Sequence, residues 1–164
     1  MEKMKILFPV DLSTVSPKIV PKVLEMGYKF GAEIHLLYVS GTLEEYSTFH
    51  VPHPSLDGFE DDIYRIAERK LQEFQEEHFA RYPDVTRSVV RGHPAEEILK
   101  YIDAKGIDLV VVGTHGRTGL ERMIFGSTAE HVIKASSVPV LSVNPYKRSY
   151  VETFTREELH EKAA

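Results

Sequence analysis

The stretch that decides the fold begins Asp108-Leu-Val-Val-Val-Gly113-Thr-His-Gly116. Nine residues follow, and then come Gly126-Ser-Thr128, a segment with helical spacing, and Val138-Pro-Val-Leu-Ser-Val143. An apolar, β-branched run that ends in glycine is typical of a parallel strand buried on both faces. The stretch therefore predicts a strand, a glycine-containing loop, a helix and a second strand, in that order.

The glycines and the serine of this stretch lie where the loop would enter its helix. Glycine has no Cβ, so the backbone can approach a ligand closely there. The free N–H groups and the dipole of a helix N-terminus attract anions. We interpret the loop as a phosphate cradle to which Ser127 adds a hydroxyl. The structural alternative is ordinary turn glycine, with Ser127 and Glu130 forming a capping box.

Apolar runs alternate with helical patterns along the rest of the chain. We expect strands at residues 5–11, 33–39, 85–90, 108–113 and 138–143, and helices starting near Ser16 (as N-cap), Asp61, Pro94 and Ser127. The alternation predicts a three-layer α/β fold with a five-stranded parallel sheet. By analogy with folds of this class, we expect the Rossmann-type strand order 3-2-1-4-5. The first and fourth strands then lie side by side at a switch point, where ligands bind. Asp11 and Gly113 would face each other across one crevice.

The composition narrows the possible functions. The 164 residues suggest one domain over 1–145 and a charged tail over 146–164. The net charge of -5 and the lack of a dense basic run argue against binding to nucleic acid or an anionic membrane. The absence of cysteine excludes disulfides, thiolate metal sites and cysteine nucleophiles. No apolar segment approaches the ~20 residues of a membrane helix, and no signal peptide is visible, so we expect a cytoplasmic protein.

Two further segments carry expectations. From Ser40 to Asp57 the periodicity disappears, which predicts a long binding loop or lid. Its two histidines, His50 and His53, are better explained as solvated loop residues than as a metal site. The helix after Asp61 should turn one apolar stripe inward, made of Ile63, Ile66, Ala67, Leu71, Phe74 and His78.

The chain resembles the universal stress protein family, in the branch that binds ATP, over about residues 3–145. The resemblance rests on Pro9-Val10-Asp11, Tyr38-Val39, Gly92-x-Pro94, Ser137-Val-Pro139-Val-Leu and, most specifically, Gly113-Thr-His-Gly116 with its nine-residue spacer and Gly126-Ser127. It implies an adenine-nucleotide α-hydrolase-like fold. It also implies that ATP is held by Pro9, Val10, Asp11, Val39, Gly113, Thr114, His115, Gly116, Arg117, Gly126, Ser127 and Thr128.

The resemblance also implies a role for each part of this set. Asp11 and the Val39 backbone would contact adenine and ribose, and Gly113 would lie against the ribose. The phosphates would be held by Gly116, Gly126, Ser127 and Thr128, with Mg²⁺ or Mn²⁺ bridging them. Asp11 has a structural alternative, because an acid at a strand end often caps the following turn at the amide of Ser13 or Thr14.

Other nucleotide-binding signatures are absent from the sequence. There is no Gly-x4-Gly-Lys-[Ser/Thr] and no Gly-x-Gly-x-x-Gly after either candidate strand. No carboxylate pair or catalytic triad emerges, so we assign no catalytic residue. We expect a nucleotide-dependent switch or sensor in stress response, with slow or absent hydrolysis. The alternatives are a cyclic-AMP binder, a protein-interaction module without nucleotide, and a true nucleotide-dependent enzyme.

The predicted fifth strand, Val138 to Val143, would lie at an edge of the sheet. It is apolar and carries no charged residue that would discourage further pairing. Two-fold pairing with a second copy would cover it, and the resemblance implies such a homodimer. The alternative is that the chain's own tail covers the edge.

Overall fold

The computed structural model describes residues 2–41, 56–114 and 126–146. Most of the predicted loop Ser40–Asp57, the residues His115, Gly116 and Arg117, and the tail beyond Tyr146 lie outside them. The elements in chain order are β1 (Lys5–Pro9), α1 (Ser16–Phe30), β2 (Glu33–Ser40), α3 (Leu56–Phe79), β3 (Val85–Arg91), α4 (Pro94–Lys105), β4 (Leu109–Gly113), α5 (Ser127–Ala135) and β5 (Val140–Val143).

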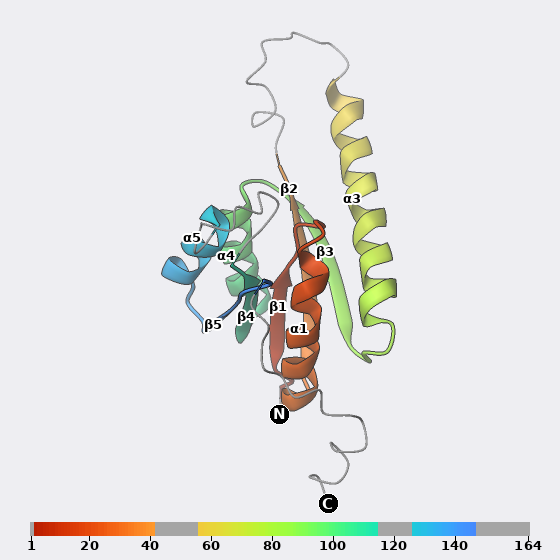
Figure 1. Cartoon of the computed structure of the whole chain (residues 1–164). Coiled ribbons are helices and arrows are strands. Elements are labelled where there is room, and N and C mark those ends of the chain that lie inside the picture. Colours follow the sequence, from red (N-terminus) through yellow and green to blue (C-terminus); the bar gives the residue numbers. More distant parts are fainter. Residues whose placement is uncertain (1, 42–55, 115–125, 147–164) are drawn as a thin grey trace, which may run out of the picture.

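The strands form a parallel five-stranded sheet in the order β3-β2-β1-β4-β5, as predicted (Figure 1). β1 pairs with β2 on one side, from Lys5 opposite Glu33 to Pro9 opposite Leu37. On its other side β1 pairs with β4, with Ile6 opposite Leu109. The strand order therefore reverses between β1 and β4, and the carboxyl ends of these two strands lie next to each other.

Two apolar clusters cover opposite faces of the sheet and make the three layers. Because successive side chains of a strand point to opposite faces, alternate residues of β1 enter different clusters. Ile6 and Phe8 pack with α1 and α3 on one face, whereas Leu7 packs with α4 and α5 on the other. Figure 1 shows α1 and α3 on one side of the strands and α4 and α5 on the other. Strands covered on both faces explain the continuous apolar runs of the sequence.

Several local predictions were wrong in their details. β5 begins at Val140 rather than at Val138, and α3 begins at Leu56 rather than at Asp61. Ile66 is 52% exposed, so it is not part of the inward stripe of α3. Ile133 of α5 is likewise 38% exposed. The spacing of apolar residues predicts which side of a helix faces the core, but the sheet does not cover the whole of that side. A residue at the margin of the apolar stripe, such as Ile66, therefore stays in solvent.

A buried polar cluster connects β2, β3 and α4 inside the sheet layer facing α4. His35 is 5% exposed, and its Nδ1 lies 3.0 Å from the Tyr101 hydroxyl, which lies 3.1 Å from Ser88 Oγ. His35 Nε2 lies 3.1 Å from Glu33 Oε1 but makes no hydrogen bond with any described residue. Burial lowers the pKa of His35, and the Glu33 carboxylate opposes this only in part.

This cluster predicts a loss of stability in acid. The folded protein keeps His35 neutral, whereas the unfolded chain takes up a proton near the ordinary value of 6.5. Because the unfolded state then binds more protons, the free energy of unfolding should decrease as the pH falls below about 6.5. Thermal unfolding between pH 8 and pH 5 should show a smaller pH dependence for His35→Gln than for the wild type. Equal slopes for the two proteins would contradict the assignment.

Candidate functional site

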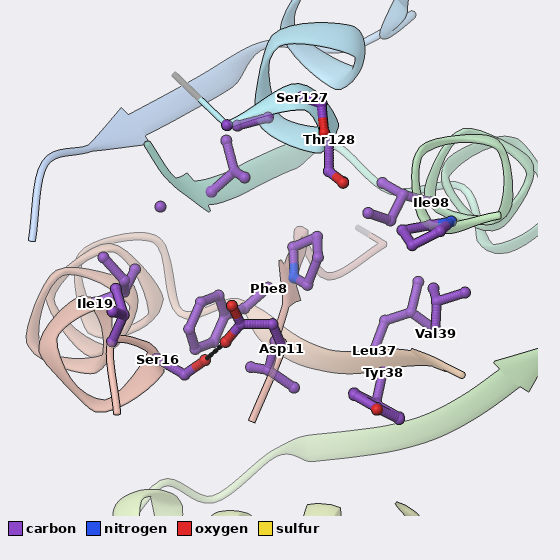
Figure 2. A pocket seen from close by; sticks show the side chains of 18 of the residues that line it. Phe8, Asp11, Ser16, Ile19, Leu37, Tyr38, Val39, Ile98, Ser127 and Thr128 are labelled. Atoms are coloured by element: carbon purple, nitrogen blue, oxygen red, sulfur yellow. Dashed lines mark hydrogen bonds between the residues drawn. The ribbon is translucent and has the colours of Figure 1, made fainter. Parts of the chain in front are cut away.

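A cavity of about 350 Å³ opens at the carboxyl ends of the strands, beside the switch point between β1 and β4 (Figure 2). This volume lies within the range of small-molecule sites, about 300–1,000 Å³. The cavity is lined by Phe8, Pro9, Val10, Asp11, Val15, Ser16, Ile19, Leu37, Tyr38, Val39, Gly41, Pro94, Ile98, Val112, Gly113, Gly126, Ser127, Thr128 and Ala129. All these residues come from the ends of β1, β2 and β4 and from the starts of α1, α4 and α5.

One side of the cavity is apolar. Leu37 and Val39 reach it from β2, and Ile98 faces it from the start of α4 (Figure 2). Pro94, the first residue of α4, also lines the cavity. Leu37 and Ile98 are also part of the core, with 0% and 2% of their surface exposed. Core packing therefore fixes the back of this wall, and the partly exposed Val39 and Pro94 offer its apolar surface to a ligand.

The turn that follows β1 brings a carboxylate to the cavity. Asp11 Oδ1 accepts a hydrogen bond from the Ser13 amide (3.0 Å) and another from Ser16 Oγ (2.7 Å). The turn-capping role foreseen for Asp11 is thus confirmed at Ser13, and the side chain lines the cavity as well. Leu12, which lies between Asp11 and Ser13, has φ 56°, a left-handed conformation that is uncommon for leucine. Backbone strain of this kind is frequent at functional sites.

The N-terminus of α5 closes the opposite side of the cavity. The Gly126 amide donates to the Thr114 carbonyl (2.8 Å), which fixes the start of α5 to the end of β4. Gly126 is the N-cap residue, and no described side chain caps the helix. The capping box considered as the structural alternative is not formed, because α5 starts at Ser127 itself and Glu130 pairs with Lys134 at 2.6 Å. Within the described part of the chain, no side chain therefore occupies the first amides of α5.

The structure brings together eight of the twelve predicted site residues. Those that line the cavity are Pro9, Val10, Asp11, Val39, Gly113, Gly126, Ser127 and Thr128. Thr114 is 6% exposed and does not line it. His115, Gly116 and Arg117 lie outside the described residues. The ligand contacts of the whole set stay a prediction.

Sequence reasoning missed the contribution of α1 and α4. Ser16, Ile19, Pro94 and Ile98 line the cavity, although the sequence indicated only that they start helices or face inward. Helical periodicity identifies an inward face but not which end of the helix reaches the switch point. A short loop from a strand to a helix start was the available signal, because such helix starts lie at the carboxyl edge of the sheet.

Within the described part of the chain, no three histidine or acidic side chains are grouped so that they could hold a metal ion. The same residues include no helix that is both long and apolar enough to cross a bilayer.

The doubly wound parallel sheet, with a cavity at its switch point, places this chain among α/β proteins of the Rossmann-like class. Residues 3–144 match the model of the universal stress protein family, and the chain belongs to this family.

Individual relatives agree with this assignment. Universal stress protein MJ0531 of Methanocaldococcus jannaschii is 33% identical over 150 residues, which cover 88% of this chain and 84% of the relative. The solved structure of protein MJ0577 from the same organism has a TM-score of 0.75 at 30% identity and covers 91% of this chain and 100% of its own. A universal stress protein in complex with cAMP has the same fold, with a TM-score of 0.56, 19% identity, and 88% and 99% coverage.

Proposed function

We propose that this protein binds ATP in the cavity at the switch point and acts as a nucleotide-dependent switch or sensor in stress response, with slow or no hydrolysis. The proposal depends chiefly on one observation. The uncapped N-terminus of α5 opens on the same cavity as the Asp11 carboxylate and the apolar wall of β2 and α4. These three surfaces match the phosphates, the polar edge of a nucleoside and the face of a base.

Each part of the nucleotide has a complementary surface. The partly exposed Val39 and Pro94, backed by the buried Leu37 and Ile98, suit the flat apolar face of adenine. The Asp11 carboxylate can accept hydrogen bonds from the amino group of adenine or from ribose hydroxyls. The amides after Gly126, together with the hydroxyls of Ser127 and Thr128, suit the phosphates, because a helix N-terminus favours negative charge.

The divalent ion belongs to the phosphates in this proposal. The described residues offer no cluster of three potential protein ligands, so Mg²⁺ or Mn²⁺ would be held mainly by phosphate oxygens and water. We therefore expect a metal requirement only together with nucleotide. Calorimetry with Mg²⁺ alone should show no binding with a dissociation constant in the micromolar range or below. In the presence of ATP, Mg²⁺ should strengthen the binding of the nucleotide.

Slow hydrolysis is what we expect from the described residues that line the cavity. Hydrolysis needs a base that positions water and a cation that stabilises the developing charge. Asp11 is the only carboxylate among the described lining residues, and it is engaged in the turn after β1. The described lining includes no lysine or arginine.

Nucleotide extraction is the test of this proposal. Freshly purified protein is denatured, and the released nucleotide is identified by chromatography. The stripped protein is then titrated with ATP, ADP and cyclic AMP, with and without Mg²⁺. We expect ATP to bind most tightly and little ADP to accumulate over hours. A preference for cyclic AMP would support a cyclic-AMP binder instead. We include this ligand because a universal stress protein of the same fold has been solved in complex with cAMP. No binding at all would favour the interaction module.

The proposed switch requires that ATP changes the conformation of the protein, which needs a measurement separate from binding. A ligand changes what a protein offers to a partner only if it binds two conformations with different affinity. Hydrogen exchange with and without ATP should therefore show protection beyond the cavity-lining segments. Protection confined to those segments would leave a nucleotide-binding protein and contradict the switch. We also expect the protein to act in the cytoplasm, which fractionation of the native cells would test.

The proposed homodimer contact is the outer edge of β5, called the open edge because no strand of the described residues pairs with it. The Val110 amide donates to the Pro139 carbonyl, and the Thr114 amide donates to the Val143 carbonyl. The backbone groups of the odd-numbered residues between 139 and 143 therefore face β4. The even-numbered Val140 and Ser142 then direct their backbone groups to the open edge.

Ser142→Pro removes one amide from that open edge and none that faces β4. Edge strands tolerate proline, so we expect a folded protein that is monomeric in sedimentation. The wild type should be a dimer at the same concentration. As a control, Ser142→Thr keeps the amide and should keep the dimer. A wild-type monomer, or a dimeric Ser142→Pro protein, would refute pairing through β5.

A further inference from the structure

The Ser16 hydroxyl is directed at Asp11 rather than at the helix that it starts. Ser16 is 5% exposed, lines the cavity and donates from Oγ to Asp11 Oδ1 at 2.7 Å (Figure 2). The sequence predicts Ser16 as the N-cap of α1. The N-cap residue is instead Val15, and no side-chain hydrogen bond caps α1. The buried hydroxyl therefore serves the carboxylate and not the helix end.

Two donors converge on one oxygen of Asp11. The Ser13 amide lies 3.0 Å from Oδ1, and the Ser16 hydroxyl lies on the same atom. One hydrogen bond to the backbone leaves the carboxylate free to tilt, whereas a second donor from a different element fixes its plane. Because Ser16 belongs to α1, it ties the orientation of the carboxylate to a helix that is packed into the core.

The turn itself is held rigidly around this contact. Leu12 has φ 56°, a left-handed conformation that is unfavourable for a non-glycine residue. Two local hydrogen bonds stabilise it, from the Val15 amide to Ser13 Oγ (3.2 Å) and from the Ser16 amide to the Ser13 carbonyl (3.2 Å). A carboxylate fixed before the ligand arrives loses less conformational entropy when the ligand binds.

We propose that Ser16 is a positioning residue, which holds the Asp11 carboxylate in the orientation that distinguishes adenine from guanine nucleotides. A carboxylate accepts hydrogen bonds and so favours the exocyclic amino group of adenine over the carbonyl oxygen of guanine at the same place. This discrimination depends on the direction of the carboxylate, because hydrogen bonds weaken steeply when misaligned. The inference rests on the proposed binding of ATP.

The test is a double-mutant cycle with two ligands. The full chain is titrated by calorimetry with ATP and with GTP as the wild type, Ser16→Ala, Asp11→Ala and the double variant. Ser16→Ala should weaken ATP binding about tenfold, or about 1.4 kcal/mol, with GTP binding nearly unchanged. In the Asp11→Ala background, Ser16→Ala should change ATP affinity by less than about twofold, because the two residues act as one unit.

Thr14→Ala is the matched control, since it removes an exposed hydroxyl from the same turn. It should leave both affinities and the melting temperature unchanged. The inference is wrong, and Ser16 is merely structural, if Ser16→Ala weakens the binding of ATP and of GTP equally. The same conclusion follows if Ser16→Ala weakens ATP binding as much in the Asp11→Ala background as in the wild type. If the wild type binds ATP and Ser16→Ala is unaffected, this inference alone fails. If the wild type binds no nucleotide, the proposed function fails and the inference with it.

Discussion

Gly126→Val is expected to reduce ATP affinity at least about 100-fold, or about 2.7 kcal/mol, while the protein stays folded. Among the described residues, a Cβ at Gly126 would have one neighbour within 4 Å, the Thr114 carbonyl oxygen at 3.8 Å, which is an ordinary contact. The backbone at Gly126 has φ -71° and ψ 155°, which valine also adopts. The branched side chain would therefore fit the protein and occupy the cavity at the uncapped end of α5.

Calorimetry with ATP and thermal unfolding of the same samples separate these two effects. Valine is a poorer N-cap than glycine, so stability should fall by no more than about 1 kcal/mol. Gly126→Ala adds only the Cβ and should give a smaller loss of affinity than Gly126→Val. Ala135→Val, at the exposed far end of α5, controls for a β-branched residue in the same helix. Unchanged ATP affinity in folded Gly126→Val would remove the phosphate site from this place.

Gly27→Ala should have the opposite signature, a large loss of stability with ATP affinity retained. Gly27 lies inside α1, where alanine is normally better by up to about 1 kcal/mol. Here a Cβ would lie 2.8 Å from the Tyr82 hydroxyl oxygen and 2.9 Å from Ile34 Cδ1. Tyr82 is 8% exposed, and its hydroxyl donates to the Ala32 carbonyl, so it cannot move aside cheaply. We expect the free energy of unfolding to fall by about 1–3 kcal/mol, as in other overpacked cores.

Urea denaturation of Gly27→Ala measures this loss. Lys29→Ala, at an exposed position two residues further along α1, should stay within about 0.5 kcal/mol of the wild type. The last turns of α1 lie at the amino-terminal end of the strands, away from the cavity, so ATP affinity at low temperature should be unchanged (Figure 1). A stabilised Gly27→Ala protein would mean that Tyr82 leaves its place easily and that helix propensity dominates.

The position of the site could be predicted from the sequence because it depends on chain order. Alternating strands and helices, together with right-handed crossovers, leave few topologies. They place the ends of β1 and β4 side by side, and the structure confirms that Asp11 and Gly113 line one cavity. The glycine positions were informative too, because a glycine at the end of a strand lets the backbone approach a ligand closely, and this can be read from the sequence alone.

The roles of single side chains could not be predicted in this way. Ser16 and Ser127 both have the sequence signature of an N-cap, yet neither caps a helix here. Ser16 bonds Asp11 across the turn, and α5 starts one residue earlier than a Ser127 cap requires. A hydroxyl can satisfy several partners at similar free energy, and the local sequence does not say which of them is nearest in space.

The sequence by itself determined the α/β class and the alternation of strands with helices, and analogy with such folds supplied the strand order that the structure confirmed. Hydrophobic periodicity and chain connectivity carry that information, and both are properties of the chain alone. Only the tertiary structure decided that α1 and α4 complete the cavity, that Ile66 stays in solvent, and that Gly27 has no room for a methyl group. These depend on which side chains from distant segments meet, and packing at the density of a crystal fixes such contacts to fractions of an ångström.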